Sequence, residues 1–321
     1  MPVFLTCLMA SIAAGQSTSV RGPVSGILYD TPSRSIRPVV GFPGASYLGQ
    51  ATLSDLDAAA VSPDGDSALV VTKGETQVIR GLRSPAPIRI SVPELADPID
   101  RFAWAANSSA LVVYSAATRR LYRLDVRPTP PVTGPPVNLS DLTGTVTGLA
   151  TNQDGSQTVI GICDTAQGGF YAVSEDAPPM RIGTTVNPGA AIFASASREL
   201  YAIDRDSRQI LYFSDGIYGG WEVLGFQEQT APITDPVGLG LSANGQKLFV
   251  AGGSDQLVRS YDLRSRTMLQ ELGLDAVPQG LSALAATVNV FVLGTRITDE
   301  QPIWVLDARL TPSVSFIPAG K

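Results

Sequence analysis

The residues best suited to chemistry in this chain are Asp and Asn side chains that stand just before short apolar segments. They are Asp57, Asp100, Asp141, Asn187 and Asp235, with Asp55, Asp97 and Asp275 in the same kind of link. Oxygen atoms of this type are the ligands that Ca²⁺ takes in proteins. If these links converge, the side chains predict an acidic rim that binds Ca²⁺ or attracts a cationic ligand. The competing interpretation is that each side chain caps backbone amides of its own loop.

The chain contains no His, which limits the catalytic and metal-binding chemistry it can perform. Without imidazole the chain has no Ser-His or Cys-His nucleophile pair and no His-ligated zinc, copper or iron. Cys163 ends an apolar run that begins at Thr158, where a thiol behaves as a small hydrophobic side chain. These observations exclude most enzyme classes and favour a protein without catalytic activity.

The acidic residues recur because the chain repeats one pattern every 40 to 50 residues or so, and such repeats of short strands are typical of a β-propeller. The clearest copy covers residues 236–262: an apolar segment, a tight turn, an aliphatic segment, and an aromatic-aliphatic segment that ends at Asp262. The sequence therefore predicts an all-β fold in which each copy is one blade. The segments expected to line the channel, such as 58–61 and 190–193, are small and apolar, so any site should lie on a face built from loops.

Counting the parts of the repeat separately leaves two arrangements open. Third strands are expected at seven places: 27–30, 77–81, 120–125, 169–174, 210–215, 258–262 and 303–307. The two strands that should precede them recur only six times, so the first copy lacks its front half. Residues 313–318 either finish the last blade, which allows six full blades plus an added pair, or pair beside residues 24–30. The second arrangement, a seven-bladed ring closed by both termini, is favoured because it leaves no raw sheet edge.

Turn residues support these strands. Ser62-Pro63-Asp64-Gly65, Asp154-Gly155 and Asn244-Gly245 each stand between two apolar runs, where a tight hairpin requires positive φ. With the Ser62 to Gly65 turn and the strand Leu248 to Gly252, the chain resembles bacterial exported β-propellers of the YVTN and WD40-like repeat type. The resemblance implies the architecture over residues 24–318 and no particular function, because these families combine enzymes and binding scaffolds.

The N-terminus predicts export. Residues 3–14 are apolar and are followed by Gly15 and a polar stretch, which is typical of a signal peptide over residues 1–15 and is too short for a membrane span. Residues 16–321 are then expected to form a single propeller domain in the periplasm or outside the cell. The net charge of -6 comes without a Lys/Arg cluster, so we expect no nucleic-acid partner.

These observations lead to two hypotheses of different class. The first is a monomeric, exported, non-catalytic module that binds a protein, peptide or glycan and needs no cofactor. The alternative is a Ca²⁺-dependent hydrolase or lactonase in which the Asp rim holds the metal and a carboxylate acts as the base.

Overall fold

The computed structural model describes residues 22–194, 198–227, 233–294 and 296–318. The predicted signal peptide, residues 1–15, lies outside the described residues. No helix that is long and apolar enough to cross a membrane is found in the described part of the chain.

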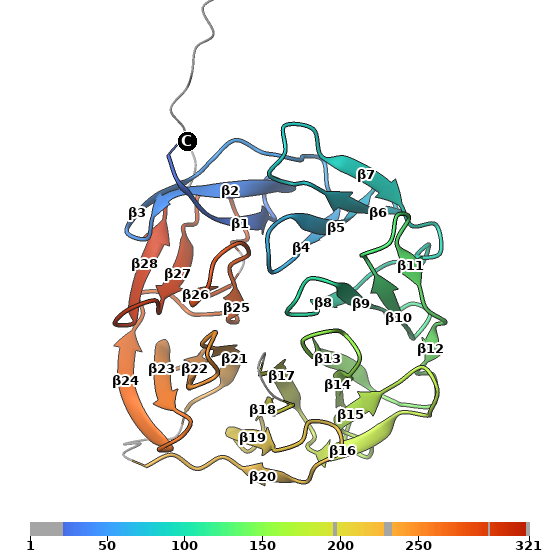
Figure 1. The fold of residues 1–321 in the computed structure, drawn as a ribbon. Helices are drawn as coiled ribbons and strands as arrows, with labels where there is room; N and C mark the ends of the chain where they lie inside the picture. The colour runs from blue at the N-terminus through green and yellow to red at the C-terminus, as the bar shows by residue number, and fades with distance from the viewer. Residues whose placement is uncertain (1–21, 195–197, 228–232, 295, 319–321) are drawn as a thin grey trace, which may run out of the picture.

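Seven small antiparallel sheets stand in a ring around a central channel (Figure 1). Blade 1 contains β1 (Val24–Asp30), β2 (Ser35–Phe42) and β3 (Ala45–Leu48); blade 2 β4 (Ala58–Val61), β5 (Ser67–Thr72), β6 (Glu75–Arg80) and β7 (Ile88–Ser91); blade 3 β8 (Arg101–Trp104), β9 (Ala110–Ser115), β10 (Arg120–Asp125), β11 (Val132–Thr133) and β12 (Val137–Asn138). Blade 4 contains β13 (Thr145–Thr151), β14 (Thr158–Cys163), β15 (Gly169–Val173) and β16 (Met180–Thr184); blade 5 β17 (Pro188–Phe193), β18 (Leu200–Asp204), β19 (Gln209–Phe213) and β20 (Trp221–Val223). Blade 6 contains β21 (Pro236–Leu241), β22 (Lys247–Gly252), β23 (Leu257–Asp262) and β24 (Thr267–Gly273); blade 7 β25 (Ser282–Ala283), β26 (Val290–Val292), β27 (Ile303–Asp307) and β28 (Ser313–Ile317). The predicted seven-bladed β-propeller is confirmed.

The turns between first and second strands have the predicted chemistry. Gly65 adopts a φ of +72°, which favours glycine, and the Ser62 hydroxyl donates to the Ser67 carbonyl while it accepts from the Ser67 amide at 3.0 Å. In blade 6 the same turn is formed by Ser242 and Gly245, with a φ of +67° at the glycine. Each of these hairpins fixes the register between the first and second strands of its blade.

Buried aliphatic and aromatic side chains fill the space between neighbouring blades. The cluster between blades 5 and 6 contains Tyr201, Ile203, Leu239, Leu248 and Tyr261. Since each blade has two apolar faces, no blade buries its surface alone and the closed ring is the stable unit.

Blade 1 differs from the other six because it lacks an innermost strand. Residues 27–30, predicted as a third strand, instead belong to β1, the strand of this sheet nearest the channel. Ile27 pairs antiparallel with Ala285, which follows β25, so β1 runs in the direction of a second strand. On the face of the first hairpins, the amide of Ala286 in blade 7 donates directly to Pro63 in blade 2 at 2.9 Å, and blade 1 contributes no hairpin there. The prediction for this strand was wrong, whereas the other six third strands are confirmed as β6, β10, β15, β19, β23 and β27.

The ring closes between the two ends of the described chain without a shared sheet. β28 pairs with β27 and completes blade 7, so the expected pairing of residues 313–318 beside residues 24–30 does not form. Closure relies instead on packing of Val39 and Leu48 of blade 1 against Leu284, Val305 and Ile317 of blade 7. The shared-strand arrangement is unnecessary because buried side chains, the bridge between Ile27 and Ala285, and an ion pair between Asp30 and Arg296 join the two blades.

Candidate binding face of the propeller

Five side chains at the entrances to the inner strands were the site residues expected from the sequence. In the fold, the links that carry them lie on the same face as the turns between second and third strands, because strand direction alternates within each blade. We call this the link face. Contacts between links and turns within single blades decide what these side chains do.

Asp57 is held by its own blade and by the neighbouring one. One carboxylate oxygen accepts the backbone amide of Lys73, in the turn between β5 and β6, at 2.5 Å. The other oxygen forms an ion pair with Arg34 of blade 1. Lys73 has a φ of +52°, a conformation that a non-glycine residue adopts at a cost, and the carboxylate stabilises that turn.

Asp100 has the same role in blade 3. It accepts the amide of Ala116, in the turn between β9 and β10, at 2.6 Å. Its neighbour Asp97 accepts the hydroxyls of Tyr122 and Thr118 at 2.6 and 2.8 Å. The hydrogen bond from Tyr122 is the main reason that the pKa of Asp97 lies below its ordinary value.

Asp235 and Asn187 are tied to blades 6 and 5. The Asp235 carboxylate contacts Arg205 at 2.7 Å, and its carbonyl accepts the amide of Gly253 at 2.8 Å. The carbonyl of Asn187 accepts the amide of Arg205 at 3.1 Å. Arg205 therefore joins the links that enter two successive blades.

Asp141 is exposed, and a residue that sequence reasoning missed caps the turn of blade 4. Asp164 accepts the amides of Ala166 and Gln167 at 2.7 Å each, and the hydroxyl of Thr143 at 3.0 Å. These bonds, led by that from Gln167, lower the pKa of Asp164. Asp164 directly follows a second strand and Asp204 ends one, so an Asp at the end of a second strand is the sequence signal that could have identified it.

The five expected residues thus occupy one face, and four of them contact turns or links of their own or adjacent blades. The described residues hold no group of three or more His, Cys, Asp or Glu arranged to bind a metal ion. Asp57 and Asp100 cap turn amides, whereas Asp235 pairs with the Arg205 side chain and Asn187 contacts Arg205 through its backbone carbonyl.

A cavity of about 230 Å³ lies where the innermost strand of blade 1 would run. Its walls come from β1, β4, β8 and β25, and they include Ala60, Trp104 and Ala283. The Trp104 indole donates to the carbonyl of Ala60 at 3.1 Å, which fixes the ring between blades 2 and 3. The cavity is mainly apolar, as the small residues of the inner strands predict.

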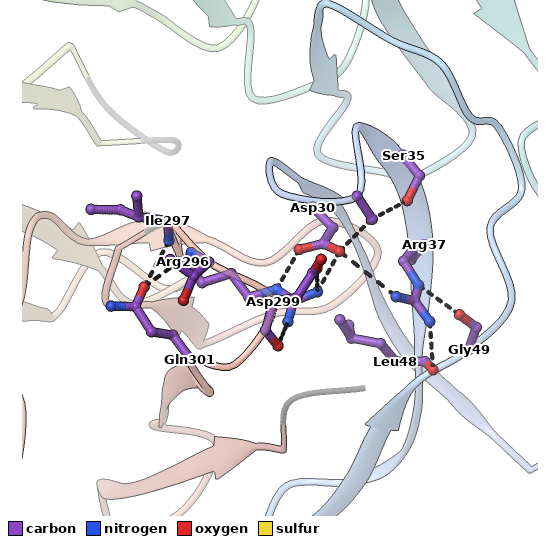
Figure 2. A network of polar contacts seen from close by, with 11 residues as sticks. Asp30, Ser35, Arg37, Leu48, Gly49, Arg296, Ile297, Asp299 and Gln301 are labelled. Atoms are coloured by element: carbon purple, nitrogen blue, oxygen red, sulfur yellow. Dashed lines mark hydrogen bonds and ion pairs between the residues drawn. The ribbon is translucent and has the colours of Figure 1, made fainter. Parts of the chain in front are cut away.

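At one end of this cavity lies a buried ion pair that no sequence pattern singled out. Arg296 donates to the two oxygens of Asp30 at 2.5 and 2.6 Å, and both side chains are almost fully buried (Figure 2). Arg296 also donates to the carbonyl of Asp299 at 2.8 Å, and Arg37 lies 3.7 Å from Asp30. Burial raises the pKa of Asp30, but the hydrogen bonds from Arg296 and Ser33 outweigh it and hold this pKa below its ordinary value.

Comparisons with known proteins support the architecture alone. No protein-family model matches the chain, and no curated protein matches it. Among solved structures, the chain is similar to the crystal structure of a functionally unknown protein from Desulfotomaculum acetoxidans DSM 771, with a TM-score of 0.54 and 13% identity. That match covers 81% of this chain and 78% of the other. At this level of identity the likeness shows the β-propeller fold and carries no function.

Proposed function

We propose that this protein is an exported, non-catalytic β-propeller that binds a protein, peptide or glycan on its link face. The observation that supports this proposal is that the rim carboxylates contact turns and links of the propeller itself. Asp57 and Asp100 each accept a hydrogen bond from a turn amide, at 2.5 and 2.6 Å, and Asp235 forms an ion pair with Arg205. These contacts build a rigid rim of ordered loops, which suits recognition of a partner.

The hydrolase alternative would need several of the same oxygens to turn toward one point. A Ca²⁺ site requires six to eight oxygen ligands at about 2.3 to 2.6 Å. Reorienting Asp57 and Asp100 would leave the amides of Lys73 and Ala116 without their acceptors. Tyr212 and Tyr261 do not supply a base near neutral pH, because burial raises the pKa of each to about 12.

Export and repeat type are parts of the same proposal. The apolar stretch at residues 3–14 supports removal of a signal peptide before Gln16, and the Ser62 to Gly65 turn supports kinship with YVTN and WD40-like propellers. The mass of the protein purified from its native host tests the first part. A mature N-terminus at Gln16 is expected, and a chain that retains Met1 contradicts it.

The binding function is tested by selection and face-specific variants. The purified protein is screened against a random peptide library and a glycan array, and hits are remeasured with D141N/D299N/E300Q, which changes exposed acids on the link face. The control is Asp66→Asn, an exposed acid in a first hairpin on the opposite face. Ligands should lose affinity for the first variant and keep it for the control. Ca²⁺-dependent turnover of ester or lactone substrates would overturn the proposal.

A further inference from the structure

The edge of β1 that faces the channel has backbone groups without strand partners. The Ile27 amide points toward blade 7 and donates to the carbonyl of Ala285 at 3.0 Å. Because the backbone groups of every second residue in a strand point to the same side, the amide and carbonyl of Tyr29 also face the channel. Ile36, which lies opposite Tyr29 in β2, donates to Leu53 at 2.9 Å and so does not bond to Tyr29. Tyr29 has no backbone partner on either side among the described residues.

The same edge lines the cavity of about 230 Å³. β1 forms one wall from Ile27 to Thr31, while Ala59 and Ala60 of β4 and Ser282 and Ala283 of β25 form the sides. Phe102 lies across from them with 37% of its surface exposed. An unpaired strand edge beside an apolar cavity is the arrangement that accepts an additional strand.

The chain itself shows what this position accepts. The other blades fill it with segments such as Ala58–Val61, Pro188–Phe193 and Pro236–Leu241, which are rich in Ala, Gly and Val. Among the described residues of blade 7, Ala285 pairs with Ile27 and so covers that end of the β1 edge. Beyond Ile27 along this edge, no backbone hydrogen bond among the described residues covers Tyr29. A strand there needs small side chains, because its neighbours on both sides are innermost strands.

The charge around the open end favours one polarity of ligand. Asp55 and Glu300 are exposed there; Asp299 is also exposed, but its carboxylate lies 3.5 Å from Arg296, and the carboxylate of Asp57 is paired with Arg34. A strand that runs antiparallel to β1 enters from this end, so the part preceding it in sequence lies against the acids. Positive charge in that part would be attracted to them.

We propose that the vacant innermost position of blade 1 binds an extended segment of another protein, with Lys or Arg followed by small apolar residues, as an added strand along Tyr29. This assignment rests on the proposed binding function and gives it a site. Backbone hydrogen bonds to Tyr29 supply the attachment, the cavity accepts the small side chains, and the acids hold the basic end.

The test uses the full chain and the fluorescein-labelled peptide KRGAVAVAG in fluorescence anisotropy. The comparison peptides are KRGAPAPAG, in which proline removes alternate amides, and EEGAVAVAG, in which the end charge is reversed. The protein variants are Ala283→Phe, which fills the cavity, and Ala283→Ser, which keeps it open. Hydrogen exchange of the Tyr29 amide is followed in parallel and needs no variant.

We expect saturable binding of KRGAVAVAG that falls at least about tenfold with either comparison peptide and with Ala283→Phe, while Ala283→Ser is unchanged; a tenfold loss corresponds to about 1.4 kcal/mol. Exchange at Tyr29 should slow when the peptide binds. Equal affinity for KRGAVAVAG and KRGAPAPAG, no effect of Ala283→Phe, and unchanged hydrogen exchange at Tyr29 would together overturn the strand site. That result would leave the proposed binding function intact. Failure of KRGAVAVAG to bind, while library ligands do bind, also overturns it.

Discussion

Asp30 and Arg296 are 266 residues apart in the chain and form a two-pronged ion pair that joins the first blade to the last. Their side chains are 0% and 2% exposed. A buried charge that loses its partner is strongly unfavourable, so each residue constrains the other. The pair lies at the junction between blades 1 and 7, where no shared strand holds the ring closed.

Removal of the guanidinium should destabilise the protein markedly. Arg296→Ala leaves Asp30 buried without its main donor, and such a loss costs about 3 to 5 kcal/mol of unfolding free energy. The matched control is Arg309→Ala, since Arg309 is half-exposed and pairs with Asp307 within blade 7 at 2.7 Å. Because 38% of the Arg309 side chain is exposed, solvent screens this pair, and it contributes about 0 to 1 kcal/mol. Urea unfolding measures both variants, and equal losses would contradict a special role for the closure pair.

The same pair gives a pH dependence of defined sign. The pKa of Asp30 is lower in the folded protein than its ordinary value of 3.8, so folding favours the ionised form. The resulting stability is fully present above the ordinary pKa and is lost as pH falls through the lowered one. Asp30→Asn lacks this titration. Between about pH 5 and pH 3 its melting temperature should therefore fall less than that of the wild type, although both share the losses from other capping carboxylates. Parallel curves would refute the assignment.

Calcium should leave the melting temperature unchanged. If the link face held a site with a Kd near 0.1 mM, about 5 mM Ca²⁺ would add roughly 2 kcal/mol of stability. Since Asp57 and Asp100 accept turn amides, we expect neither a thermal shift nor binding heat. A Ca²⁺-dependent rise in melting temperature that disappears in Asp100→Asn would reinstate the metal rim.

Capping by Asp100 can be measured separately. Asp100→Ala removes the acceptor for Ala116 and should cost about 1 kcal/mol, whereas Asp100→Asn keeps an acceptor oxygen and should cost less. Asp141→Ala is the control, because Asp141 is exposed and caps no turn among the described residues. Denaturant midpoints decide the matter. A loss for Asp141→Ala as large as that for Asp100→Ala would mean that capping is not the cause.

Local patterns predicted the blades well because turns and strands are local. The hairpins at Gly65 and Gly245 follow directly from residues that tolerate positive φ. The order of strands in blade 1 could not be predicted, since a strand ending at Asp is not specific to the third position. Asp204 ends a second strand and Asp262 a third, and both accept amides from the turn that follows. A strand that ends at Asp therefore predicts the turn that follows, but it does not predict whether the strand is second or third in its blade.

Closure and the cavity escaped prediction for a different reason. Arg296 and Asp30 are 266 residues apart and are brought together by the whole ring, so no local spacing in the sequence encodes that contact. The links that carry the expected rim residues lie on one face of the ring. Whether the rim carboxylates point to a common ligand or to their own turns depends on side-chain geometry that composition does not determine.

Hydrogen exchange of the full chain, with and without a ligand selected from the peptide or glycan libraries, tests the binding proposal most directly. The account predicts slower exchange on ligand binding at the link face, including the amides of Lys73 and Ala116, and no change in the first hairpins around Gly65 and Gly245. Protection confined to those hairpins, or ligand turnover during the experiment, would contradict a non-catalytic binding role for the link face.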